Sequence, residues 1–328
     1  MTRRREFLFA FAAAALSTPL ASFAQPPPAK NLRIGLLGAE SASGFASRVE
    51  ALHAGLRELG YVEGRNVLTE YRFAEGKYDR LPVLAADLVR SKADVIVTSG
   101  TPATRAAKDA TSSIPIVMAS SGDAVATGLV ASLARPGGNL TGSAFLSPEL
   151  TAKRLEMLKE ALPRISRVGY VSNPGNPVVR ANLKAMEVTG GSLKVGVRRF
   201  DARGAGDVDG IFAAMAEARV DAVVIGQDSL FTTNHRAIAD LAAKHRLPAI
   251  GAREFAEAGG LFGYGHDNLV LWRRAAIYID KIVRGAKPAD LPIQQPTNFE
   301  LVVNMKTARA LGISVPNSIA QRADKVIE

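Results

Sequence analysis

The 328-residue chain contains no cysteine. It therefore forms no disulfide and carries no thiol for lipid attachment, metal binding or nucleophilic catalysis. Histidine is scarce as well, and the four that occur lack metal-ligand spacing: His53, His235, His245 and His266. The short motifs of serine hydrolases, P-loop NTPases and zinc proteases are missing. We therefore expect no metal, no cofactor and no enzymatic activity.

Aromatic residues are few, at 6% of the chain with a single Trp, and the charge is unbalanced, at +10. The basic residues are scattered apart from a cluster at 3–5. Nucleic-acid-binding grooves interleave basic and aromatic side chains, and no segment here does so. The composition argues against nucleic acid as a partner. With 47% hydrophobic residues the chain is globular, and its length favours two domains.

The N-terminal apolar run is too short to span a bilayer. "FLFAFAAAAL" covers 7–16, whereas a spanning helix needs roughly 20 apolar residues. It follows three arginines and precedes the small residues Ser22 and Ala24, which is the layout of a cleaved signal peptide over 1–24. "RRREFL" fits the twin-arginine pattern, and a Sec signal is the alternative. We predict export to the periplasm with cleavage near Ala24.

Beyond residue 31, short apolar runs alternate with stretches of helical periodicity. Strands are expected at "LRIGLLG", "NVLTEYRF", "ADVIVTSG" and "IPIVMAS", and then at "RVGYVSN", "KVGVRRF", "DAVVIGQ" and "LPAIG". The helices between them include one over 122–134, "GDAVATGLVASLA". This alternation predicts an α/β fold of two doubly wound parallel-sheet lobes.

The last sixty or so residues are expected to connect the lobes. A helix after "GGLFGYGHDN" places Leu269, Trp272, Ala276, Ile279 and Val283 on one face, and we expect it to pack back on the first lobe. The predicted division is an N-terminal lobe of 31–145 plus 267–285, a C-terminal lobe of 146–266, and a return strand with the tail over 286–328. The crossings would form a multi-strand hinge on which the lobes close.

Polar loops follow the predicted strands in both lobes. Ligands of open α/β sheets bind outside the carboxyl ends of the strands, so these loops are the candidate site. Their candidate contacts are Ser41, Ser43, Thr101, Ser121, Asp123, Asn173, Asn176 and Asp228. Each alone is more often a helix cap than a ligand contact. Asp123 and Asp228 can accept an ammonium group, and Arg253 or a helix N-terminus can bind a carboxylate.

Three long strings carry a family resemblance: "GDAVATGLVASLARPGGNLTG", "GAKPADLP" and "NFELVVNMKTARALG". They resemble the ABC-transporter substrate-binding family that includes tryptophan- and tyrosine-binding members, and the resemblance runs from about 31 to 326. It implies a periplasmic binding protein type I-like fold, no catalysis, and delivery of ligand to a membrane permease and its ATPase. The family's ligand loops match Ser99, Thr101, Ala103, Ser121, Asp123, Asn173 and Asp228.

The first loop departs from the aromatic-amino-acid binders. It reads "AESAS" where a Gln is common, so the resemblance does not specify tryptophan. We expect a monomeric periplasmic solute-binding protein that captures an amino acid or an aromatic or organic acid between its lobes. The alternatives are a ligand-sensing receptor of the same fold and an exported α/β enzyme. The enzyme would need a nucleophile and base held together, which the loops do not offer.

Overall fold

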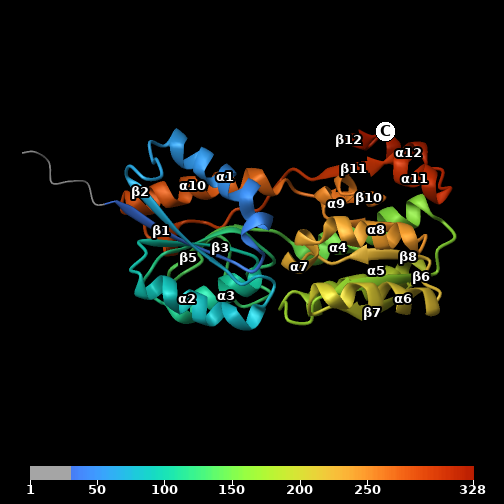
Figure 1. Cartoon of the computed structure of the whole chain (residues 1–328), viewed down its shortest axis with the longest axis horizontal. Coiled ribbons are helices and arrows are strands. Elements are labelled where there is room, and N and C mark those ends of the chain that lie inside the picture. The colour runs from blue at the N-terminus through green and yellow to red at the C-terminus, as the bar shows by residue number, and fades with distance from the viewer. Residues whose placement is uncertain (1–30) are drawn as a thin grey trace, which may run out of the picture. The chain divides into compact units, whose positions relative to one another are not determined.

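Residues 31–328 are described by the computed structural model, and two sheets organise them (Figure 1). The predicted signal peptide and its twin-arginine motif lie outside the described residues. The first sheet is entirely parallel, in the order β2-β1-β3-β4-β5. Its strands are β1 (Leu32–Gly38), β2 (Val67–Phe73), β3 (Val95–Ser99), β4 (Ile116–Ser121) and β5 (Leu140–Ala144).

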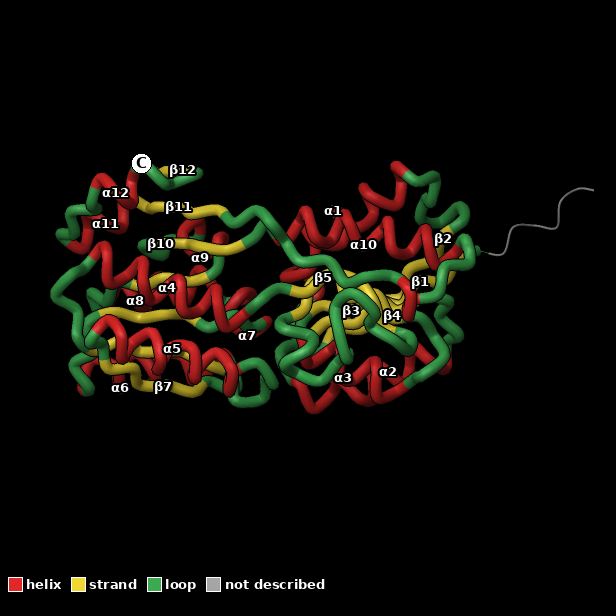
Figure 2. Tube along the Cα trace, turned by 180° about the vertical axis from the view of Figure 1, so that it is seen from behind, coloured by secondary structure: helices red, strands yellow, loops and turns green. Residues whose placement is uncertain are grey.

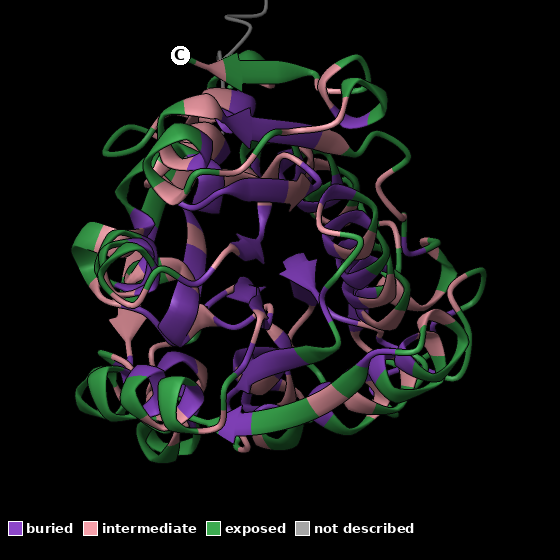
Figure 3. Ribbon diagram, turned by 90° about the vertical axis from the view of Figure 1, so that its right-hand side faces the viewer, coloured by how far each residue is buried: buried purple, intermediate pink, exposed green. Residues whose placement is uncertain are grey.

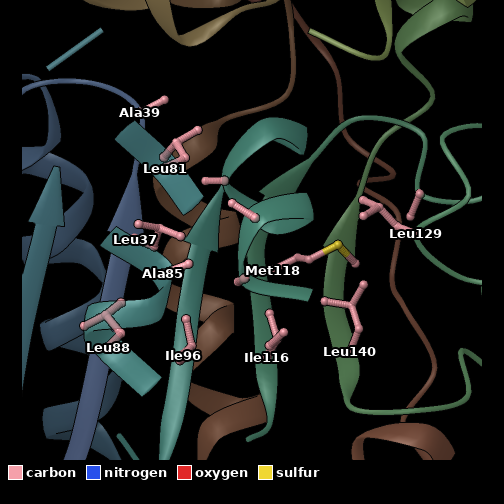
Figure 4. Close-up of a cluster of buried hydrophobic side chains, with 14 of the residues drawn as sticks. Leu37, Ala39, Leu81, Ala85, Leu88, Ile96, Ile116, Met118, Leu129 and Leu140 are labelled. Carbon is pink, nitrogen blue, oxygen red and sulfur yellow. The ribbon is translucent and has the colours of Figure 1, made fainter. Parts of the chain in front are cut away.

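Helices cover both faces of this sheet. One face carries α1 (Ala42–Glu58) and α10 (Asn268–Val283), and the other carries α2 (Leu81–Arg90) and α3 (Thr101–Ala110). A 3₁₀ turn, η1 (Tyr78–Arg80), precedes α2. Figure 4 shows Leu81 and Leu88 of α2 beside Leu37 and Ile96 of the strands, in a cluster that also contains Met118. Strands buried on both faces need apolar side chains in both directions, which is why they read as continuous apolar runs.

The second sheet has the order β12-β11-β10-β9-β8-β6-β7. All neighbours are parallel except β10 and β11. Its strands are β6 (Arg167–Ser172), β7 (Gly196–Asp201), β8 (Ala222–Ile225), β9 (Ala249–Gly251), β10 (Phe262–Gly265), β11 (Glu300–Asn304) and β12 (Lys325–Ile327).

Two groups of helices enclose the second sheet. One face packs against α4 (Ser147–Ala161), α5 (Val179–Leu193), α11 (Met305–Leu311) and α12 (Asn317–Ala320). The other packs against α6 (Val208–Glu217), α7 (Ser229–Thr233), α8 (His235–Lys244) and α9 (Arg253–Glu257), with η2 (Ala205–Asp207) leading into α6. In Figure 3 the inner strands are buried, whereas the edge strands β7 and β12 and the outer sides of the helices carry exposed residues.

Within residues 31–328 the chain passes between the two lobes three times (Figure 2). The first passage joins β5 to α4, and the second joins β10 to α10. The third passage follows η3 (Pro288–Asp290). Gln294 is still held in the first lobe, where its carbonyl accepts a hydrogen bond from the Ala144 amide, and the chain then continues into β11 of the second sheet. The C-terminal strands β11 and β12 therefore belong to the second sheet.

Two details differ from the sequence predictions. The helix expected over 122–134 is wrong, because this segment forms turns. Asp123 accepts hydrogen bonds from the amides of Val125 and Ala126, and Gly128 has a φ of +69°, which no right-handed helix contains. On α10, Trp272, Ala276 and Ile279 are buried as expected, whereas Leu269 and Val283 at its two ends are exposed.

Candidate functional site

The strand orders of both sheets place polar loops together at one edge. In the first sheet β1 lies between β2 and β3, so the loops after β1 and β3 diverge to opposite faces. In the second sheet β6 and β8 are neighbours in the same way. Such switch points leave a crevice at the carboxyl ends of the strands. A cavity lies there, lined by both lobes: Glu40, Arg48, Ser99, Gly100, Thr101, Ser120, Gly122, Phe145, Ser147, Asn176, Val178, Gln227, Asp228, Ser229, Thr232 and Asn268.

Asp228, after β8, is the most densely bonded side chain of the cavity. Its Oδ1 accepts from the Tyr78 hydroxyl at 2.8 Å, from Asn173 Nδ2 at 3.2 Å and from the Leu230 amide at 2.9 Å. Its Oδ2 accepts from Asn176 Nδ2 at 2.8 Å. Burial raises the pKa of this carboxyl, while these donors act to lower it. Asp228 therefore caps α7 and fixes the loop after β6.

Glu40, after β1, supplies a second buried carboxylate. Its Oε1 accepts from Arg48 Nη1 at 2.8 Å, and its side chain is 3% exposed. No described atom hydrogen-bonds to its Oε2, which is also shielded from solvent. Burial raises the pKa of Glu40, Arg48 opposes this rise, and the Asp228 charge adds to it. Glu40 of the first lobe and Asp228 of the second thus line the same cavity.

Four helices begin at the cavity wall. Their first residues line it: Thr101 of α3, Ser147 of α4, Ser229 of α7 and Asn268 of α10. A helix N-terminus offers free N–H groups and partial positive charge, so α3, α4 and α10 favour an anionic group there. The hydroxyls of Ser99 and Ser120 add polar contacts, and Ser120 donates to Asn268 Oδ1 at 3.3 Å.

Gly122 allows the lobes to approach each other. A β-carbon at this position would lie 2.6 Å from Val178 Cγ1 of the second lobe. It would also lie 3.1 Å from Thr101 Oγ1, which accepts the Gly122 amide hydrogen bond. Only glycine lets the loop after β4 lie this close to α5.

Arg154 of α4 supports the wall without an acidic partner in hydrogen-bond contact. It is fully buried, and its Nε and Nη2 donate to the Tyr264 carbonyl at 2.9 and 2.7 Å. Nη2 also donates to Gln227 Oε1 at 3.3 Å, and Nη1 has no partner among the described residues. Burial lowers the pKa of Arg154 to about 10. Arg154 therefore orients Gln227 toward the cavity.

Four of the residues predicted from the sequence line this cavity: Ser99, Thr101, Asn176 and Asp228. Two more, Ser41 and Asn173, line an adjoining cavity that shares Glu40 and Ser229 with it. Ser121 and Ala103 are buried behind the wall, where the Ser121 hydroxyl lies 3.3 Å from Thr101 Oγ1.

The other three predicted residues lie outside the cavity lining. Ser43 is exposed and hydrogen-bonds to Ser41 Oγ at 3.1 Å. Asp123 caps its own turn. Arg253 pairs with Glu300 of β11 and with Glu257.

The sequence reasoning missed Glu40, Arg48, Gln227, Asn268 and Tyr78. The Glu40–Arg48 pair had no readable signal, because its members are eight residues apart and the helical pairing rule covers residues three or four apart. Tyr78 had none, since it follows β2 and reaches Asp228 across 150 residues.

Comparison with known proteins shows which family the chain belongs to. A family model described as ABC transporter substrate binding protein matches residues 36–327. The chain belongs to this family. The resemblance and the two-lobed, periplasmic binding protein type I-like fold predicted from the sequence are confirmed. The family implies a small-molecule ligand and an ABC permease as partner.

Three relatives illustrate the similarity. A tyrosine-binding protein of Clostridioides difficile is 25% identical over 258 residues, which are 78% of this chain and 74% of that protein. A Vibrio cholerae structure called a conserved domain protein has a TM-score of 0.85 at 28% identity, covering 90% of this chain and 100% of that one. A Streptococcus pneumoniae ABC domain in complex with L-Trp has a TM-score of 0.83 at 25% identity, covering 91% and 100%.

Residues 31–328 lack two further features. None of the described helices is both long and apolar enough to cross a membrane. No group of three or more histidine, aspartate or glutamate side chains in that range is arranged to hold a metal ion.

Proposed function

We propose that this protein is the periplasmic solute-binding subunit of an ABC importer. It captures an amino acid or a small organic acid in the cavity between its lobes and delivers it to the permease and its ATPase. One observation carries the proposal: loops at the switch points of both sheets line a single polar cavity. The protein acts as a monomer after removal of an N-terminal export signal.

Closure of the lobes on the ligand follows from this arrangement. A ligand shifts an open–closed equilibrium only by its different affinity for the two forms. Thr101 of the first lobe and Asn176 of the second both line the cavity, so a ligand bound there touches both lobes. One moving body consists of residues 31–145 and 267–285. The other consists of residues 146–266 together with β11 and β12, which belong to the same sheet. Because only the connecting segments change, each core stays packed.

Binding is favoured over catalysis by the chemistry of the lining. The residues around the cavity include hydroxyls and two carboxylates, but no histidine or lysine. Among the described residues, no serine or threonine forms a hydrogen bond of normal geometry with the carboxylate of Asp228 or Glu40, so neither carboxylate is placed to activate a hydroxyl nucleophile. The relatives named for tyrosine binding and solved with L-Trp support an amino acid as ligand.

A thermal-shift screen of the purified mature protein tests the proposal. The screen covers the twenty amino acids and a set of aromatic and branched organic acids. A ligand should raise the melting temperature by mass action, and small-angle scattering should show a smaller radius of gyration with the best hit. Consumption of the hit during the assay would instead indicate an enzyme. A tight ligand without a change in radius would contradict the closing hinge.

A further inference from the structure

The side chains that line the cavity include two carboxylates and one cationic group. Two buried carboxylates, Glu40 and Asp228, face it, and Arg48 is the one cationic side chain that lines it. Arg48 hydrogen-bonds Glu40 only through Oε1. Arg154 behind the wall hydrogen-bonds to neither carboxylate. A buried carboxylate oxygen is costly unless it is hydrogen-bonded, so the closed form leaves one such oxygen to be compensated.

The two carboxylates differ in what they can still accept. Asp228 already takes four hydrogen bonds from Tyr78, Asn173, Asn176 and Leu230. Glu40 Oε2 takes none from any described residue and is shielded from solvent. The Ser229 hydroxyl of the second lobe acts as a weak donor that lowers the pKa of Glu40, but it forms no hydrogen bond of normal geometry with this oxygen. The free acceptor of the cavity is therefore Glu40 Oε2.

We propose that Glu40 is the specificity-determining residue of the site and binds a cationic nitrogen of the ligand through Oε2. This inference rests on the proposed function and narrows it, because it selects ligands with an ammonium group and rejects organic acids that lack one. A bound ammonium supplies the missing donor and makes the hydrogen bond charge-assisted. The helix N-termini of α3, α4 and α10 around the same cavity then remain for a carboxylate.

Pairs of ligands that differ only by the amino group test this without any variant. The probes are L-tryptophan, L-tyrosine and L-leucine against indole-3-propionate, 3-(4-hydroxyphenyl)propionate and 4-methylpentanoate, measured by calorimetry on the wild-type protein. We expect binding by at least one amino acid and affinity about 30-fold or more weaker for its analogue without the amino group. Equal affinity within such a pair would overturn the role of Glu40 while leaving the solute-binding function in place. Failure of all six probes to bind would remove both.

A charge-neutral variant locates the contact. Glu40→Gln should lower the affinity for the bound amino acid about 30-fold or more, and it should not weaken that for its analogue, which has no ammonium group to lose. Glu50→Gln is the matched control, since Glu50 lies on α1, pairs with Arg57 and is 68% exposed. Unchanged amino-acid affinity in Glu40→Gln would contradict the inference. If this variant does not fold, the ligand pairs above decide alone.

Discussion

Tyr78 donates a hydrogen bond of 2.8 Å to Asp228 Oδ1, and this bond joins the two lobes. Tyr78 begins η1, directly after the loop that follows β2 and turns back through Glu75 and Gly76 at φ values of +53° and +78°. The Gly76 amide anchors this turn to the Ala39 carbonyl at 2.7 Å. Burial and the Asp228 charge raise the pKa of Tyr78 well above its usual value. The phenol therefore stays protonated and can donate its hydrogen bond. The first lobe thereby contacts the cavity's central carboxylate even before a ligand is considered.

Removing this bond should weaken ligand binding. Tyr78→Phe leaves Asp228 three donors and removes only the link between lobes, so we expect about 5- to 30-fold lower affinity by calorimetry. Tyr61→Phe is the control, because the Tyr61 hydroxyl donates to Asp280 at 3.1 Å within the first lobe. Equal losses in both variants would show that the effect is general destabilisation.

The two aspartates predicted from the sequence should behave differently. In Asp228→Asn an amide donor faces groups that already donate, so we expect a lower melting temperature and an affinity loss of about 2 to 5 kcal/mol. Asp123→Asn keeps an acceptor for the amides of its own turn, so its affinity should stay within twofold. Calorimetry and thermal unfolding measure both. Wild-type affinity in Asp228→Asn would remove this residue from the site.

His266 should make the protein sensitive to acid. Burial, followed by the Arg154 charge, lowers its pKa to about 4 although Asn268 opposes this shift, and neither ring nitrogen forms a hydrogen bond of normal geometry among the described residues. In the unfolded chain a histidine takes up its proton near pH 6.5. Its contribution is therefore fully present above pH 6.5 and is lost progressively as the pH falls toward 4.

His266→Gln isolates this contribution. At pH 5 protonation of the unfolded chain should cost the wild type about 2 kcal/mol of unfolding free energy that the variant does not lose. Urea titrations at pH 7 and pH 5 measure the difference. Glu40 and Asp228, whose pKa values are raised, gain stability on acidification, but they do so equally in both proteins. Parallel losses in wild type and variant would refute the assignment.

Much of the site could be predicted because parallel strands bring their carboxyl ends to one edge. Thr101, Asn176 and Asp228 follow strands that the apolar runs identify, and all three line the cavity. The burial of Glu40 could not be predicted, because the sequence of the loop after β1 is typical of an exposed loop. It is the second lobe that covers this loop. Arg253 follows a strand too, but Glu300, 47 residues later, turns it away from the cavity.

Export is testable directly, although its signal lies outside the described residues. Mass spectrometry of the periplasmic protein should show a chain that starts near Gln25, because Ser22 and Ala24 suit a signal peptidase. Replacing Arg4 and Arg5 together by Lys should abolish export by the twin-arginine route. Normal export of that double variant would establish the Sec route instead.

The interleaving of the lobes constrains the order in which the protein can fold during synthesis. The face of the first sheet under α1 is completed by Trp272 and Ile279 of α10, so it stays partly open until the ribosome has passed residue 283. The second sheet is complete only after β11 and β12, which end at Ile327, have been synthesised. Neither lobe can therefore mature on the nascent chain while the other is still being made. A chain stalled at residue 266 would expose apolar surface on both sheets and be a target for chaperones and proteases.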